Sequence, residues 1–179
     1  MAFRDLLLSA MILVICVAAP AQSRIYGLGR TPSAEEIRAW DIAISPEGKE
    51  LPAGSGTSDQ GAKLYAQKCA ACHGANGSGG LAPAVVVNKD PTATGRQRRV
   101  MVAKVPFAPV LWDYINRAMP MKVGPGTLTP DEVYSLTAFL LYKNDVIKEN
   151  EVLDAQSLPK VKMPNRDGFI PPVTKGQKP

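Results

Sequence analysis

Histidine and cysteine are scarce in this chain of 179 residues, which contains one histidine and three cysteines. If the N-terminal segment is removed as an export signal, only Cys69 and Cys72 remain, so no disulfide can join distant parts of the chain. A structural zinc site normally needs four Cys or His ligands, and Cys69, Cys72 and His73 supply too few. The sequence also lacks a strand pattern, an internal repeat and a nucleic-acid-binding motif, so its net charge of +5 does not indicate nucleic-acid binding.

The N-terminal segment 1–21 has the features of an export signal. Arg4 precedes an apolar run over residues 6–19, and the small-residue sequence "APA" ends at Ala21, before the expected cleavage point. The apolar run is shorter than the roughly 20 residues that span a bilayer, so an uncleaved membrane anchor is the less favoured alternative. We therefore expect a periplasmic protein that contacts a membrane only if this segment is retained.

The rest of the chain divides into three parts by composition. Residues 22–56 are rich in Gly, Pro and charge and are predicted to form an N-terminal extension with one short helix, capped by Ser33 and Glu36. Residues 57–146 contain three helix patterns and a long Gly- and Pro-rich loop. Residues 147–179 are rich in Pro and Lys without any period, and are predicted to form an extended C-terminal arm. We expect both extensions to be ordered by docking onto a partner rather than by packing on the domain.

The three helix patterns of residues 57–146 differ in how clearly they are marked. The first, "SDQGAKLYAQKC", can be capped by Thr57 or Ser58, and the second is "VLWDYINRAM". The third is the clearest, because Thr129 and Glu132 form a capping box, and Pro130 fits the first helical position. The chain is therefore predicted to be all-α.

The sequence "CAACH" brings together Cys69, Cys72 and His73. Cys-X-X-Cys-His is the attachment sequence for c-type haem. The spacing places the two sulfurs about one helical turn apart, where they can form thioethers with the haem vinyl groups, and the histidine supplies the proximal nitrogen to iron. A redox-active dithiol is the alternative, but it normally occurs in a βαβ context and leaves His73 without a role. We predict one covalently bound haem c.

The second axial ligand cannot be histidine, because His73 is the only one. Methionine is the usual alternative and favours a high reduction potential. Met119 directly follows the helix pattern "WDYINRA", and Pro120 ends that helix and fixes the loop that presents the sulfur. We predict Met119 as the ligand, with Met121 as the next candidate; Met101 and Met163 are the other two methionines outside the export signal.

These features resemble those of class I cytochromes c. In that family a glycine and an aromatic residue of the first helix pack across the last helix, and here Gly61 and Tyr65 match the pair, with Leu136 and Phe139 on the last helix. The family also has a proline whose carbonyl accepts the ring N–H of the haem histidine, and the matching position is Pro83. The resemblance implies a class I cytochrome c fold, in which three or more helices and long loops wrap the haem, with extensions at both ends.

A narrower resemblance covers most of the expected mature chain. The segments "YGLGRTPSAEEIRAWDIAI", "WDYINRAMP", "LTPDEVYSLTAFLLYKNDVI" and "LPKVKMPNRDGF" are similar to the cytochrome subunits of periplasmic sulfite and sulfane (Sox-type) dehydrogenases. The resemblance implies a subunit with no catalysis of its own, which accepts electrons from a molybdenum-cofactor dehydrogenase subunit and passes them to a soluble cytochrome c.

The chain departs from this family between residues 85 and 107. A basic cluster of Arg96, Arg98, Arg99 and Lys104 lies where the family has an aromatic-rich segment. A solvated loop is the default interpretation of such a cluster, and docking onto an acidic partner is the alternative.

Two other functions stay open from the sequence. One is a free-standing electron shuttle, and the other is a haem enzyme or gas sensor whose iron keeps an open site. The loop at Met119 and Pro120 offers a second ligand to the iron, which favours electron transfer over an iron with an open site. The extensions on both sides of the domain favour a fixed partner, because a free-standing shuttle needs no such segments.

Overall fold

The computed structural model describes residues 28–89, 100–122, 124 and 126–168. The segment 1–21 that we interpret as an export signal lies outside these residues, as do the three arginines of the basic cluster. The chain divides into two units between Arg38 and Ala39. Within the described ranges, no helix combines the length and the apolar character needed to span a membrane.

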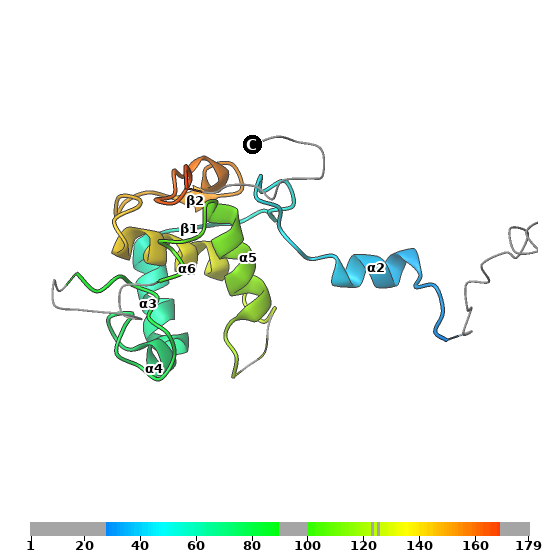
Figure 1. The fold of residues 1–179 in the computed structure, drawn as a ribbon, viewed down its shortest axis with the longest axis horizontal. Coiled ribbons are helices and arrows are strands. Elements are labelled where there is room, and N and C mark those ends of the chain that lie inside the picture. The colour runs from blue at the N-terminus through cyan, green and yellow to red at the C-terminus, as the bar shows by residue number, and fades with distance from the viewer. Residues whose placement is uncertain (1–27, 90–99, 123, 125, 169–179) are drawn as a thin grey trace, which may run out of the picture. The chain divides into compact units, whose positions relative to one another are not determined.

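The described residues form a mostly helical fold, as the sequence predicts (Figure 1). The helices are α2 (Ala34–Trp40), α3 (Ser58–Lys68), α4 (Ala70–His73), α5 (Ala108–Ala118), α6 (Pro130–Lys143) and the 3-10 helix η2 (Leu158–Lys160). Two short strands, β1 (Ser55–Gly56) and β2 (Leu153–Asp154), pair antiparallel with Ser55 opposite Asp154. This strand pair is the one departure from an all-helical arrangement in the described part of the chain.

Capping boxes fix where the two long helices α3 and α6 begin. Thr57 caps α3, since its side chain accepts from the backbone N–H of Gln60 while the Gln60 side chain accepts from the N–H of Thr57 at 3.0 Å. Thr129 and Glu132 form the same reciprocal pair before α6. Each box satisfies two N–H groups that the first helical turn would otherwise leave without a partner.

The core forms where α3 crosses α6 (Figure 1). Gly61 of α3 lies against the backbone of Ser135 in α6, and a Cβ at this position would meet the Ser135 carbonyl oxygen at 2.0 Å. One turn later, the rings of Tyr65 and Phe139 pack with their centroids 5.0 Å apart. The glycine and aromatic pair therefore crosses the last helix as the family resemblance implies.

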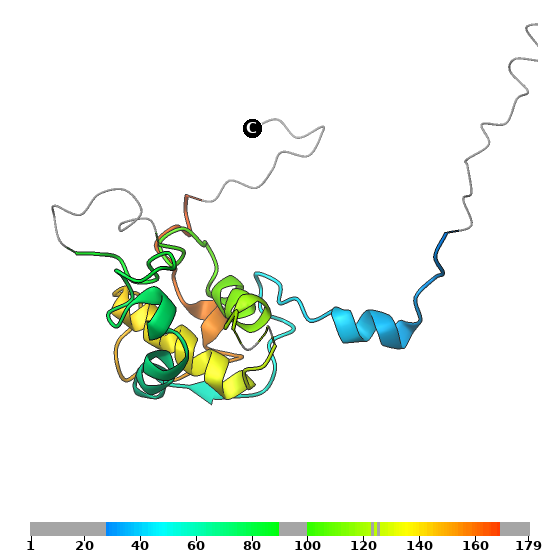
Figure 2. The ribbon, with the colours of Figure 1, turned by 90° about the horizontal axis from the view of Figure 1, so that it is seen from below.

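The segment after residue 146 packs on the domain, contrary to the prediction of an extended C-terminal arm. Leu153, Leu158 and Met163 are 1%, 0% and 1% exposed, so residues 153–163 contribute to the core and are not an extended arm. Strand β2 packs against α6, and η2 packs against α5 (Figure 2). The prediction failed because isolated apolar residues in an aperiodic segment give no periodic signal, although each of them can be buried.

The last part of the N-terminal extension is also integrated into the domain. Leu51 is buried, and the Tyr134 hydroxyl donates to the Pro52 carbonyl at 2.9 Å. The Ser55 N–H donates to a carboxylate oxygen of Asp131 at 2.8 Å. The predicted boundary at residue 57 is therefore too late, because side chains of α6 form hydrogen bonds with the backbone of the preceding residues.

Candidate functional site

The three residues of the "CAACH" motif are positioned by α4, a single helical turn that follows α3 directly. The backbone N–H groups of Cys72 and His73 both donate to the Cys69 carbonyl, at 3.1 and 3.0 Å. All three side chains are half-buried, and Cys69 packs against the core. The turn therefore holds both thiols and the imidazole on one short, hydrogen-bonded segment.

The imidazole of His73 is oriented by Pro83. Its Nδ1 lies 2.7 Å from the Pro83 carbonyl oxygen, which can only accept a hydrogen bond, so we assign the proton to Nδ1. Nε2 then carries the lone pair that a metal ion requires. A bond of this kind fixes both the tautomer and the ring orientation of a ligating histidine. The contact is the one that the family resemblance implies for Pro83.

A glycine-rich loop places Pro83 by folding back onto α4. The Ala82 N–H donates to the Cys72 carbonyl at 2.8 Å. Gly80 approaches the same carbonyl so closely that a Cβ would lie 2.2 Å from its oxygen. The glycines after the motif are therefore needed because the loop must pass against the backbone of the helical turn that carries the cysteines.

Two polar side chains make contacts with this loop that the sequence did not predict. The Tyr65 hydroxyl donates to the Gly74 carbonyl at 2.9 Å. The Asn144 side chain accepts a hydrogen bond from the Val87 N–H through Oδ1 at 2.9 Å, and its Nδ2 donates to the Val85 carbonyl at 3.0 Å. Asn144 is the residue at which α6 ends, and no local pattern in the sequence indicates its contact with a loop that lies more than 50 residues earlier.

The environment of the Cys69 thiol does not suit redox exchange. Cys69 and Cys72 are free thiols. Burial raises the pKa of the Cys69 thiol to about 11, against the opposing charge of Lys68. Catalytic dithiols work with thiol pKa values lowered below the usual 8.5 or so, so that a thiolate forms. A thiol that stays protonated does not suit that chemistry.

The four candidate methionines lie in different environments. Met119 ends α5, is half-buried and has an extended backbone, and the following peptide bond to Pro120 is cis. Met121 is 81% exposed, Met163 is 1% exposed within the core, and Met101 packs against the core. In Figure 1, α4 and the loop after α5 extend to the same side of the fold. These placements favour Met119, and its role as a ligand stays a prediction.

Helix α5, which ends at the candidate ligand Met119, carries a buried donor without an acceptor in the described part of the chain. Trp112 is 2% exposed, and its Nε1 has no hydrogen-bond partner in the described part of the chain. An unpaired buried N–H costs about 1–3 kcal/mol, so an acceptor from outside the chain would be stabilising. Haem carries two carboxylates that can accept such a bond. The free thiols and the oriented imidazole fit a haem, and the Trp112 Nε1–H is a donor that such a group could satisfy.

A site for a bare metal ion is not found in the residues that the structure describes. No group of three or more His, Cys, Asp or Glu side chains among them is arranged to hold an ion. His73 has Nε2 available, but it lacks the further protein ligands that a zinc or iron centre without a macrocycle would need.

Comparisons with known proteins agree with this chemistry. The family model for cytochrome C oxidase, cbb3-type, subunit III matches residues 56–140. A solved chain of the sulfane dehydrogenase SoxCD from Paracoccus pantotrophus is 37% identical, with a TM-score of 0.68. That match covers 81% of this chain and 71% of the SoxCD chain. None of the curated proteins matches this chain.

Proposed function

This chain belongs to the class I c-type cytochromes, and from that membership we propose that it is the electron-transfer subunit of a sulfur-compound dehydrogenase. As a cytochrome, it carries electrons and does not itself transform a substrate. Two observations together support the proposal: the chain contains the "CAACH" turn, and it is 37% identical to a chain of a sulfane dehydrogenase.

The residues of the site have separate roles in holding the cofactor. The Cys69 and Cys72 thiols would form the covalent links, and His73 would ligate through Nε2 while Pro83 keeps its ring in place. Met119 would supply a second ligand to the iron, and the Trp112 Nε1–H would be available to a haem carboxylate. When bound, the haem supplies reversible one-electron chemistry at iron. Met and His ligation together favour a high reduction potential, which suits an acceptor of electrons from a dehydrogenase.

The proposed electron donor is a molybdenum-cofactor dehydrogenase subunit, and the proposed acceptor is a soluble cytochrome c. Support for the donor comes from the similarity to the SoxCD chain, which covers 81% of this chain. The proposed location is the periplasm, as the export signal over residues 1–21 implies. Covalent haem attachment agrees with this location, because the attachment occurs outside the cytosol.

The cofactor part of the proposal is tested on protein purified from a periplasm that contains the haem-maturation machinery. Mass spectrometry should show one haem per chain, and acid-acetone extraction should leave it attached. Cys72→Ser should block stable maturation, because one of the two covalent links is lost. A haem that acid-acetone removes from the wild-type protein would contradict the proposed attachment.

The partner part of the proposal is tested by mixing the holoprotein with the organism's sulfite or sulfane dehydrogenase and its substrate. Stopped-flow absorbance should show reduction of the cytochrome by one electron per chain. If sulfite and thiosulfate oxidation proceed unchanged in a strain that lacks this chain, the free-standing shuttle replaces the subunit as the better interpretation.

A further inference from the structure

The segment 28–42 exposes four large apolar side chains. Leu28, Ile37, Trp40 and Ile42 are 87%, 51%, 87% and 47% exposed, and no residue of α2 is buried. Ile37 and Trp40 are three residues apart and therefore share one face of α2. Clustered exposed apolar side chains indicate an interaction surface, and tryptophan is the residue most enriched among side chains that dominate binding energy.

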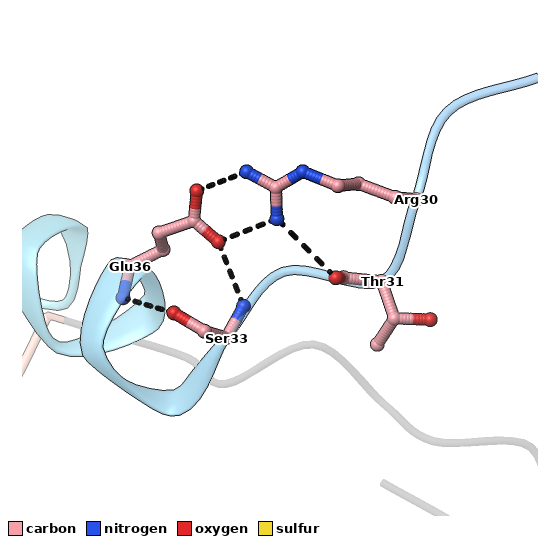
Figure 3. Close-up of polar contacts among 4 residues, drawn as sticks. All are labelled: Arg30, Thr31, Ser33 and Glu36. Atoms are coloured by element: carbon pink, nitrogen blue, oxygen red, sulfur yellow. Dashed lines mark hydrogen bonds and ion pairs between the residues drawn. The ribbon is translucent and has the colours of Figure 1, made fainter.

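Helix α2 is braced by its own side chains rather than by burial (Figure 3). The Glu36 N–H donates to the Ser33 hydroxyl at 3.1 Å, and the Ser33 N–H donates to Glu36 at 2.8 Å. The Arg30 guanidinium pairs with both carboxylate oxygens of Glu36. A helix of seven residues would be marginal by itself, so this bracing keeps its apolar face formed before any partner binds. Less ordering entropy is then lost on association.

The residues that follow α2 are fastened to α5. The Ile44 N–H donates to a carboxylate oxygen of Asp113 at 2.9 Å, and Asp113 also pairs with Arg117. Asp113 lies on the helix that ends at Met119, the predicted iron ligand. The four residues from Trp40 to Ile44 span at most roughly 14 Å when extended. A partner that binds Trp40 is therefore held within about 14 Å of Ile44, which is hydrogen-bonded to Asp113 of α5.

We propose that segment 28–42 is a docking arm whose Ile37 and Trp40 side chains insert into an apolar groove on the dehydrogenase subunit. This proposal rests on the proposed function, which supplies the partner. The SoxCD chain matches 81% of this chain, whereas the haem-domain family model matches only residues 56–140, so the similarity extends into the flanking segments. No residue of α2 is buried, and the solved chain that this chain resembles belongs to a dehydrogenase, so we take the dehydrogenase as the occupant.

The test compares full-length holoprotein with the double variant Ile37→Gln/Trp40→Gln. Glutamine removes the apolar contacts and keeps good helix propensity. Val152→Gln is the matched control, since Val152 is 54% exposed and lies outside the arm. The probe is the molybdenum subunit of the organism's sulfite or sulfane dehydrogenase, purified without its cytochrome. Affinity is measured by calorimetry and electron transfer by stopped-flow absorbance.

The arm is supported if the double variant binds about tenfold or more weakly, as expected on losing a central aromatic anchor, while its spectrum and the control stay unchanged. Equal binding and reduction of all three proteins would overturn the arm and leave the proposed function standing. Failure of the wild type itself to bind or be reduced would remove the proposed partner and with it the arm. A wild-type dimer, or binding to anionic lipid vesicles, that the double variant loses would assign the surface to another occupant and overturn the proposal.

Discussion

Gly61 lies so close to Ser135 that a Cβ on the glycine would be 2.0 Å from the serine carbonyl oxygen and 2.6 Å from Cβ of Phe139. Two helix backbones touch at this point, and the contact sets the angle from which α3 delivers the "CAACH" turn. The position of the haem-binding turn therefore depends on residue 61 being a glycine, which has no Cβ.

Replacing Gly61 by alanine should lower the free energy of unfolding. The added methyl group has to push two helices apart, and overpacking of this kind costs about 1–3 kcal/mol even though alanine favours a helix. Urea denaturation of the holoprotein measures the effect. Lys63→Ala, at an exposed position of the same helix, is the control and should stay within about 0.5 kcal/mol of wild type. A Gly61→Ala protein as stable as wild type would show that the helices separate without cost.

Met119→Ala should abolish the sulfur-to-iron charge-transfer band of the oxidised protein and lower its reduction potential. The band depends on the thioether ligand, and its loss leaves the iron with a weaker or different sixth ligand. Absorption spectroscopy and redox titration measure the two effects. Met121→Ala, in the same loop but 81% exposed, is the matched control and should retain the band. The reverse result would transfer the ligand assignment to Met121.

A chain that ends at Asn150 should be severely destabilised. It loses Leu153, Leu158 and Met163, all at most 1% exposed, and burying one such side chain contributes about 1.5–3 kcal/mol. The summed loss of about 5 kcal/mol or more approaches the whole stability of many domains. Thermal unfolding of the holoprotein measures it, and Val152→Gln, a change at a 54% exposed position, is the control and should unfold like wild type. If the shorter chain keeps full stability, the packing of this segment contributes nothing.

The ion pair between Arg30 and Glu36, here called the clamp on α2, should persist to low pH. The hydrogen bonds from Arg30 hold the pKa of Glu36 at about 2, below its ordinary 4.5. Because the pKa is lowered in the folded helix, the stabilising effect is complete above about 4.5 and disappears as the pH falls towards about 2. A carboxyl NMR titration should find the low midpoint, and Arg30→Gln should return it towards 4.5. Arg38→Gln, outside the clamp, is the control, and an unshifted midpoint in Arg30→Gln would contradict the pairing.

The sequence predicted the parts of the fold that carry a repeating or local signal. Helices α3 and α6 follow from their apolar period and from the capping boxes at Thr57 and Thr129. The Cys-X-X-Cys-His turn is local, and its neighbour Pro83 was found through family resemblance rather than through any physical signal in the sequence.

The remaining contacts have no such signal because they join distant, aperiodic segments. Leu153 and Leu158 are buried singly, and burial of an isolated leucine depends on a surface that other helices create. Asn144 holds Val85 and Val87 from far along the chain, although its own neighbours indicate only a helix end. The unpaired Nε1 of Trp112 is visible only after the packing around it is known.

The antiparallel pairing of β1 with β2 brings the two ends of the haem-binding region together. Ser55 and Asp154 lie opposite each other in the ladder, so the chain enters and leaves the haem-binding region at points separated by about 5 Å. A unit whose two chain ends are adjacent can be repeated in tandem, or inserted into a loop of another protein, without distorting the backbone of either protein. Leu51, Leu158 and Met163 lie outside the two strands but are buried in the same core, so the residues that flank the ladder would have to move with such a block.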